Sequence, residues 1–226
     1  MGSKNRIAKY ILPIILKDRR PNQWYVEPFV GGCNLIDKVD GLRYGNDFCS
    51  YLIAMWQALQ DGWIPPQKFS EEEYKHIKNN KETYEKHLVG YVGYNLSYGA
   101  KWFGGYRRDK AGVRDYALEA YNNVMKQVPK IKDVLFYNKS YDDLILPPNS
   151  ITYCDPPYEN TTKYKTDFNH EAFWEWAKNC AKEGHTIYIS EYNAPKDFIC
   201  IWEKEIASSL TKDTGSKKGI ERLFTI

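Results

Sequence analysis

The chain has few cysteines and histidines, and neither residue type is grouped. Its 226 residues include five cysteines, an odd number, and none of them forms a C-x-x-C pair. Scattered single cysteines argue against a disulfide framework and against a cysteine zinc site, and they suit a reducing cytosol. The four histidines are also dispersed and lack metal-ligand spacing. We therefore expect a protein that needs no metal.

Long apolar runs and a large net charge are missing as well. No window approaches the length of a membrane span, and because basic residues interrupt the first apolar stretch we expect no signal peptide. We expect a cytoplasmic protein of bacterial or phage origin with no membrane partner and no obligate protein partner. The formal net charge is only +3, so any basic surface that binds nucleic acid has to be local.

Apolar spacing predicts an α/β fold with a mostly parallel sheet. Helical periodicity marks residues 4–17 and 49–61, and a further helix is marked around 173–177. The expected strands are 24–29, 42–46, 134–137, 151–154 and 186–190. Alternation of strands and helices is typical of parallel strands joined by crossover helices. The tail, roughly 199–206 and 221–226, predicts a closing antiparallel hairpin.

The stretch from residue 68 to residue 132 breaks this alternation. It contains no convincing strand, and Ser70 with Glu73 predicts a capping box at the start of a polar helix. We interpret 68–132 as a helical insertion, with 1–67 and 133–226 forming the main domain.

A loop at the centre of this insertion, residues 98–108, is rich in aromatic, glycine and basic residues. Cations neutralise phosphates, arginine can read guanine edges, and aromatic rings stack on bases or wedge between them. The alternative is a solvated surface loop with a few packed rings. We favour nucleic-acid contact, and the residues expected to make it are Lys101, Trp102, Tyr106, Arg107 and Arg108.

The most informative stretch is Asp155-Pro156-Pro157-Tyr158, which follows the expected buried strand 151–154. The Asp155 carboxylate can accept an N–H bond from an amino group, and the carbonyl of Pro156, held by the fixed φ of proline, can accept another. Tyr158 offers a face for a planar ring. These four residues, here called the platform, are suited to grip an exocyclic amino group at the C-terminal end of a strand, where open α/β sheets bind ligands.

A glycine turn and an acid suggest a nucleotide-like cofactor. Gly31 and Gly32 form a tight turn between a strand and a helix, without the spacing of a dinucleotide fingerprint or a P-loop. Asp47 ends the next strand, where a carboxylate can accept both hydroxyls of a ribose. A simple tight turn and a helix cap are the structural alternatives. Glu191, Tyr192 and Asn193 also follow a strand and could border the same pocket.

Together these motifs resemble the Dam-type N6-adenine DNA methyltransferases, the D12 class. The likeness rests on 26–32, on the platform, and on the order of cofactor motif, insertion and platform. It spans nearly the whole chain and is weakest in the insertion. It implies a Rossmann-like methyltransferase sheet, S-adenosylmethionine as the methyl donor, and double-stranded DNA as the substrate.

By motif position, the resemblance also implies roles for single residues. Asp155 would be catalytic, with Pro156 and Pro157 beside it and Tyr158 stacking on the base. The implied cofactor residues are Lys4, Phe29, Gly31, Gly32, Asp47, Phe136 and Asp155. Two departures from the family pattern stand out. Cys33 stands where a glycine or small residue is usual. The aromatic that the family carries upstream of the lysine is missing or replaced if Met1 is the true start.

The expected reaction is methyl transfer to N6 of a flipped adenine. Hydrogen bonds from the amino group to Asp155 and to the Pro156 carbonyl free its lone pair for attack. Three alternatives stay open: an N4-cytosine methyltransferase, which more often carries Ser in place of Asp155, a glutamine-modifying enzyme, and a DNA-binding module without turnover. The sequence gives no recognition site, although restriction-modification is one expected setting.

Overall fold

A seven-stranded sheet organises the computed structural model, which describes residues 4–109, 111–159, 168–207 and 218–226. The strands are β1 Tyr25–Glu27, β2 Arg43–Asn46, β3 Val134–Tyr137, β4 Ile151–Cys154, β5 Thr186–Glu191, β6 Ile199–Ala207 and β7 Lys218–Thr225. Their order is β3-β2-β1-β4-β5-β7-β6. The first five are parallel, whereas β7 pairs antiparallel with both β5 and β6. The predicted parallel sheet and closing hairpin are confirmed.

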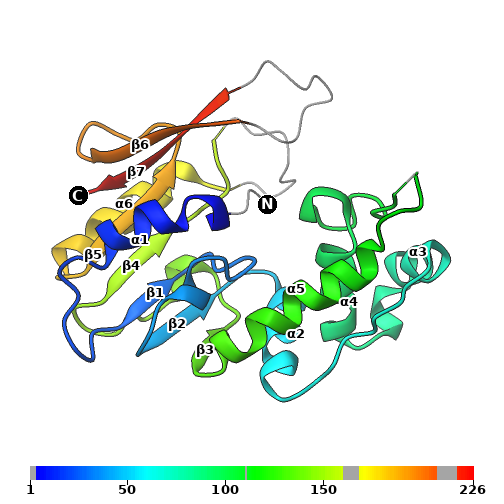
Figure 1. Ribbon diagram of the computed structural model, residues 1–226. Helices are drawn as coiled ribbons and strands as arrows, with labels where there is room; N and C mark the ends of the chain where they lie inside the picture. The colour runs from blue at the N-terminus through cyan, green and yellow to red at the C-terminus, as the bar shows by residue number, and fades with distance from the viewer. Residues whose placement is uncertain (1–3, 110, 160–167, 208–217) are drawn as a thin grey trace.

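Helices cover the sheet and form a separate group at one side of it (Figure 1). The α-helices are α1 Ala8–Ile15, α2 Ser50–Gln60, α3 Glu71–Asn79, α4 Lys86–Asn95, α5 Tyr116–Ile131 and α6 His170–Lys182. Short 3-10 helices are η1 Lys4–Arg6, η2 Ile36–Lys38, η3 Lys81–Thr83, η4 Tyr98–Ala100 and η5 Tyr141–Asp143. The helix expected after the glycine turn is therefore only a single 3-10 turn.

Alternation of side chains along the strands builds a core on each face of the sheet. In β4, Tyr153 packs into the cluster formed by α1, α2 and α5, whereas Cys154 packs against α6. Leu223 and Phe224 of β7 divide between the same two clusters. Successive strand residues point to opposite faces, so a strand buried on both sides is mostly apolar. Accordingly α1 and α6 lie on opposite faces of the β4–β5 region (Figure 1).

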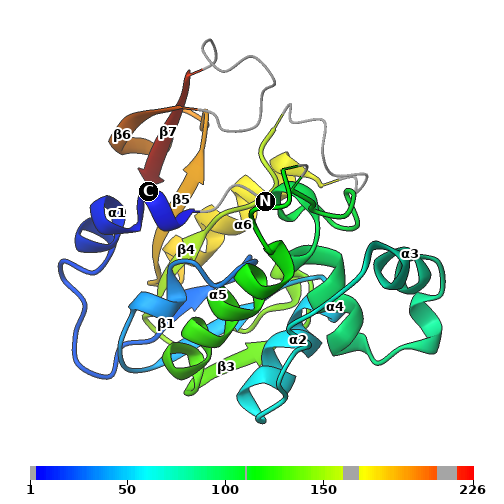
Figure 2. The same ribbon diagram turned by 45° about the vertical axis from the view of Figure 1, so that its right-hand side comes forward.

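In the described part of residues 68–132, all regular elements are helices, apart from one isolated β-bridge between Ser97 and Tyr106. The predicted capping box is present at α3, where Ser70 and Glu73 exchange hydrogen bonds. α3 and α4 lie to one side of the sheet, away from the β6–β7 hairpin (Figure 2). α4 approaches α2 so closely that a Cβ on Gly90 would lie 2.1 Å from the Tyr51 carbonyl oxygen.

The last helix of this stretch, α5, returns to the sheet. Its Gln127 and Lys130 contact the glycine turn and Arg43 of β2, respectively. None of the helices in the described part of the chain is long and apolar enough to cross a membrane.

Candidate active site

The platform lies at the point where the strand order reverses. β1 has β2 on one side and β4 on the other, so the connections diverge between β1 and β4. Open α/β sheets bind ligands beside the C-terminal ends of strands at such a switch point. Asp155 follows directly after β4, and the glycine turn follows β1. The fold therefore brings both sequence motifs to one edge of the sheet.

Lys4 is a buried cation beside the platform. Its Nζ lies 3.4 Å from Asp155 Oδ1 and donates a 2.7 Å hydrogen bond to Glu221 Oε2. The same ammonium contacts the Tyr158 hydroxyl and lies 4.5 Å from the centroid of that ring. Only 6% of Lys4 is exposed. A buried ammonium needs such partners, and two carboxylates supply them here.

Asp155 itself is only partly exposed, and its environment acts in two directions. Burial raises the pKa of this carboxyl to about 6, which the nearby Glu221 reinforces, while Lys4 lowers it. The negative form is thus disfavoured by desolvation and favoured by its ion pair. Near neutral pH the carboxylate form prevails, and it is a stronger acceptor of an N–H bond than the protonated carboxyl.

Glu191 fixes the chain just beyond the platform. It ends β5, is 2% exposed, and accepts hydrogen bonds from the backbone N–H groups of Glu159 (3.1 Å) and Tyr192 (2.7 Å). Burial raises its pKa to about 7. The rings of Tyr192 and Tyr158 are nearly perpendicular, with their centroids 4.7 Å apart. The structure therefore brings Glu191 and Tyr192, but not Asn193 by any described contact, to the platform.

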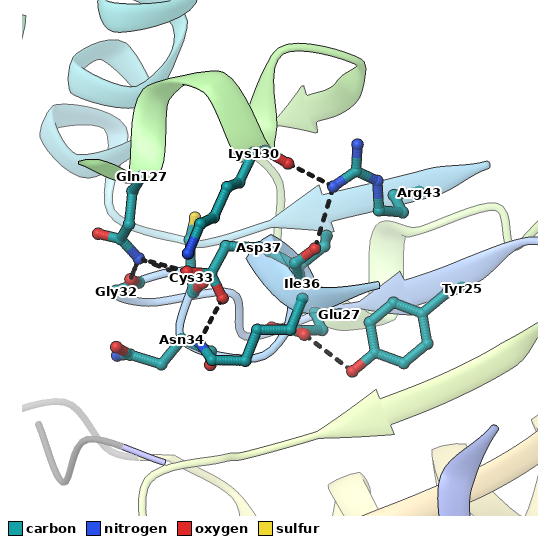
Figure 3. A network of polar contacts seen from close by, with 11 residues as sticks. Tyr25, Glu27, Gly32, Cys33, Asn34, Ile36, Asp37, Arg43, Gln127 and Lys130 are labelled. Atoms are coloured by element: carbon teal, nitrogen blue, oxygen red, sulfur yellow. Dashed lines mark hydrogen bonds and ion pairs between the residues drawn. The ribbon is translucent and has the colours of Figure 1, made fainter. Parts of the chain in front are cut away.

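A buried polar network holds the glycine turn (Figure 3). Gln127 of α5 donates to the carbonyl oxygens of Gly32 (3.1 Å) and Cys33 (3.4 Å). Below the turn, the Tyr25 hydroxyl donates to Glu27 Oε1 at 2.8 Å. The backbone is left-handed at Gly31 (φ 48°) and at Cys33 (φ 54°). Glycine tolerates that conformation, so its place at Gly31 follows from the turn, whereas Cys33 is held there by packing.

Asp47 joins the glycine turn to the start of α2. Its Oδ2 accepts the Gly31 N–H at 3.1 Å, and its Oδ1 accepts the Cys49 N–H at 2.9 Å. Burial raises its pKa, and these two hydrogen bonds oppose that rise. The N-cap of α2 is Cys49 rather than Asp47. Because each carboxylate oxygen has two lone pairs, Asp47 keeps capacity for further donors.

Three phenylalanines near the ligand-binding edge of the sheet differ in packing and in exposure. Phe29 packs against Tyr141 with ring centroids 5.5 Å apart. Phe136 is 7% exposed and stacks on Trp56, so it lies in the main core. Phe48, next to Asp47, is 74% exposed. Sequence reasoning did not single out Phe48, although a large apolar residue between an acid and a helix start is a usable signal.

The basic aromatic loop lies beside the start of α2. Trp102 stacks on Tyr51 of α2 (5.3 Å between centroids) and packs on Tyr94 of α4 (4.9 Å). It is still 36% exposed. Tyr106 donates its hydroxyl to the Phe69 carbonyl, and Lys101 is half-buried at the turn. The loop is therefore a packed structure whose aromatic rings are partly buried.

Its two arginines hold acidic partners on the surface. Arg107 lies 3.8 Å from Glu119, with its guanidinium 4.0 Å from the centroid of Tyr116. Arg108 pairs with Glu71 at 3.0 Å. Exposed pairs of this kind contribute about 0–1 kcal/mol each. Both arginines can thus exchange these partners for a stronger anion at small cost.

The sheet order and the position of the platform define a Rossmann-like methyltransferase. The model of the D12 class N6 adenine-specific DNA methyltransferases matches residues 1–91 and 89–200. The chain therefore belongs to the D12 class of N6 adenine-specific DNA methyltransferases. S-adenosylmethionine is accordingly its methyl donor, and the Asp47 carboxylate beside a backbone turn without side chains fits an adenosyl group.

Solved structures show only distant likeness. The chain is 10% identical to TrmN from Thermus thermophilus (TM-score 0.40), covering 98% of this chain and 48% of that one. It is 9% identical to HI0767 from Haemophilus influenzae, assigned as a methylase (TM-score 0.39), covering 99% and 98%. SMU.472, assigned as a methyltransferase and complexed with SAH, is 11% identical (TM-score 0.37), covering 98% and 52%. The chain thus spans about half the length of two of the three. Comparison with curated proteins gave no match.

Proposed function

We propose that the chain methylates the exocyclic N6 of an adenine in double-stranded DNA, in a site-specific manner. The observation that carries this proposal is the platform at the sheet's switch point, with Asp155 beside the buried ammonium of Lys4. Membership of the D12 class supports adenine as the base and DNA as the polymer.

Asp155 and Pro156 act on the amino group. The N6 lone pair is delocalised into the ring, so the nitrogen is a weak nucleophile. Hydrogen bonds from its two hydrogens to the Asp155 carboxylate and to the Pro156 carbonyl favour a tetrahedral nitrogen with an available lone pair. S-adenosylmethionine would supply the electrophilic methyl group: the methyl–sulfur bond breaks as the N–C bond forms, S-adenosylhomocysteine leaves, and the methylated nitrogen releases one proton to solvent. Catalysis then consists of positioning and electrostatic stabilisation by these fixed acceptors.

Tyr158 stacks on the target base after the base has left the DNA duplex. The amino group of a paired adenine is inaccessible within the duplex, so the base has to flip out before it reaches the platform. The Tyr158 ring, held by its hydroxyl and packed nearly perpendicular to Tyr192, offers a stacking surface. Asp47, Gly31 and Gly32 would hold the adenosyl part of the donor, with Lys4, Phe29 and Phe136 as the further expected contacts.

Residues 68–132 serve, in this proposal, as the target-recognition unit, with 1–67 and 133–226 as the catalytic unit. The loop with Lys101, Trp102 and Tyr106 lies beside α2, which begins next to Asp47. Arg107 and Arg108 can leave their surface acids to neutralise phosphates or contact guanine.

Nucleoside analysis tests the proposal. The purified chain is incubated with mixed-sequence duplex DNA and S-adenosylmethionine carrying a labelled methyl group, and the DNA is then digested to nucleosides. We expect the label in N6-methyladenine. Label in N4-methylcytosine would show that the substrate base is cytosine and not adenine. Label in a protein acceptor would point to glutamine modification. DNA binding without any methyl transfer would indicate a module that has lost turnover.

A further inference from the structure

Glu221 has no part in the reaction described so far, yet it contacts Tyr158 of the platform and the Lys4 ammonium beside it. It lies on β7, which runs antiparallel to β5 with Arg222 opposite Glu191. Since Glu191 is the last residue of β5, Glu221 lies one position beyond the C-terminal end of that strand. The reversed direction of β7 thus brings a carboxylate from the end of the chain to the ligand-binding edge.

Glu221 Oε2 accepts two hydrogen bonds. Lys4 Nζ donates one at 2.7 Å, and the Tyr158 hydroxyl donates the other at 2.9 Å. The ammonium is closer to Glu221 than to Asp155 Oδ1, which lies 3.4 Å away. One carboxylate therefore holds both the orientation of the Tyr158 ring and the place of the Lys4 charge.

We infer that Glu221 is a positioning residue for methyl transfer: it orients Tyr158 for base stacking and draws Lys4 away from Asp155, which leaves Asp155 able to accept the substrate amino group. This inference rests on the proposed function, because it assigns Glu221 a role in the same reaction. A cation fully paired with Asp155 would compete with the N–H donor, whereas a cation shared with a second carboxylate competes less.

Charged or titratable groups from several elements lie near Asp155, with Lys4, Tyr158 and Glu221 among them. Lys4 comes from η1, Tyr158 from the platform, Glu221 from β7, Glu27 from β1, Tyr153 from β4 and Glu191 from β5. Within this set Glu221 raises the pKa of Asp155 and Lys4 lowers it. Removing the Glu221 charge therefore lowers the pKa of Asp155 twice, directly and by releasing Lys4 toward it.

The test compares Glu221→Gln with a matched control, Glu203→Gln. Glu203 is an exposed acid of the same hairpin that contacts Arg222 at 3.2 Å and does not touch the platform by any described contact. Two quantities are measured: the pH dependence of kcat for methyl transfer, and the pKa of Asp155 by NMR of labelled aspartate carboxyls, assigned with Asp155→Asn.

For Glu221→Gln we expect kcat to fall about 10- to 100-fold with little change in the KM for the methyl donor. The acid limb of the kcat profile and the titration of Asp155 both move down by roughly one pH unit. Glu203→Gln leaves all of these unchanged. Glu221→Asp, which keeps the charge on a shorter arm, restores the Asp155 titration but not the full kcat.

The inference is overturned if Glu221→Gln matches Glu203→Gln in either kcat or the Asp155 titration. A second variant tests the contact with Tyr158: in a Tyr158→Phe background, which lacks the hydroxyl, Glu221→Gln has to cost less than it does in the wild type, and an equal cost contradicts a joint role. The titration requires no turnover. A wild-type chain without methyl transfer would refute the proposed function, while an unchanged Asp155 titration in Glu221→Gln would separately refute the present inference.

Discussion

The backbone N–H of Glu159 donates a 3.1 Å hydrogen bond to Glu191 Oε2, which ties the residue after the platform to the end of β5. The other oxygen of Glu191 accepts the Tyr192 N–H at 2.7 Å. One buried side chain thus holds the chain segments behind Tyr158 and behind its edge-on neighbour Tyr192. The shape of the surface proposed to bind the base therefore depends on Glu191, a residue that need not touch the base.

Replacing Glu191 by alanine is expected to loosen the platform. Two partly buried N–H groups lose their acceptor, which costs at most about 1–3 kcal/mol for each group that water cannot satisfy. We expect a measurable drop in the free energy of unfolding, and a fall in kcat of about tenfold or more with near-normal binding of the methyl donor. Glu183→Ala, at the exposed end of α6, is the control. Equal kcat in the two variants would show that Glu191 does not support the platform.

Glu27 makes stability depend on pH. Burial raises its pKa from 4.5 to about 8 in the folded protein. The folded state therefore binds a proton that the unfolded state releases between these values, so stability falls as the pH rises from about 4.5 to 8. Each group of this kind contributes a slope of at most about 1.4 kcal/mol per pH unit.

The variant Glu27→Gln removes this titration. We expect the loss of unfolding free energy between pH 5 and pH 8 to be smaller in Glu27→Gln than in the wild type, as measured by denaturant unfolding at several pH values. The comparison isolates Glu27 from other groups that titrate in the same range. Parallel pH profiles for the two proteins would contradict the raised pKa of Glu27.

The arginines of the basic loop are expected to contact phosphate or guanine. Arg107→Ala combined with Arg108→Ala should weaken duplex binding by about tenfold or more and reduce the salt dependence by about one unit of slope for each lost phosphate contact. Binding of the methyl donor should not change. The control is Lys182→Ala with Lys196→Ala, which removes two exposed charges elsewhere. Unchanged DNA affinity of the double variant at moderate salt would show that this loop does not contribute to DNA binding.

Asp47 is expected to decide binding of the methyl donor. Asp47→Ala removes the acceptor expected for the ribose hydroxyls and also frees the Gly31 and Cys49 N–H groups. We expect calorimetric affinity for S-adenosylmethionine to fall by about tenfold or more, in line with the loss of charged hydrogen bonds of 1.5–3 kcal/mol. Asp61→Ala, at the other end of α2, is the control. Equal affinity in both variants would assign Asp47 a purely structural role.

Local patterns predicted much of the fold. Strand alternation, the Ser70 capping box and the glycine turn each depend on a few neighbouring residues, and each is found in the structure. β1 is shorter than expected, because it pairs with β2 over Tyr25–Glu27 and with β4 only at Tyr25 and Val26. Parallel strands also explain why the platform and the glycine turn could be placed at one edge from the sequence.

Contacts between distant residues could not be predicted in this way. Lys4 and Glu221 are 217 positions apart, and only the antiparallel return of β7 brings them together. Likewise the sequence marks Arg108 as basic but does not show its ion pair with Glu71. The same holds for Trp102, whose stacking on Tyr51 depends on the packing of α4 against α2. These features follow from tertiary packing rather than from local pattern.

The most direct test of the proposed function is the rate of N6-methyladenine formation by the wild type and by Asp155→Ala, measured with labelled S-adenosylmethionine and duplex DNA. Asp143→Ala, which changes an exposed acid of η5, is the control, and circular dichroism checks that each variant is folded. We predict N6-methyladenine from the wild type and from the control, and none above background from Asp155→Ala. Substantial methylation by a folded Asp155→Ala, or no labelled adenine from the wild type, would contradict the proposed mechanism.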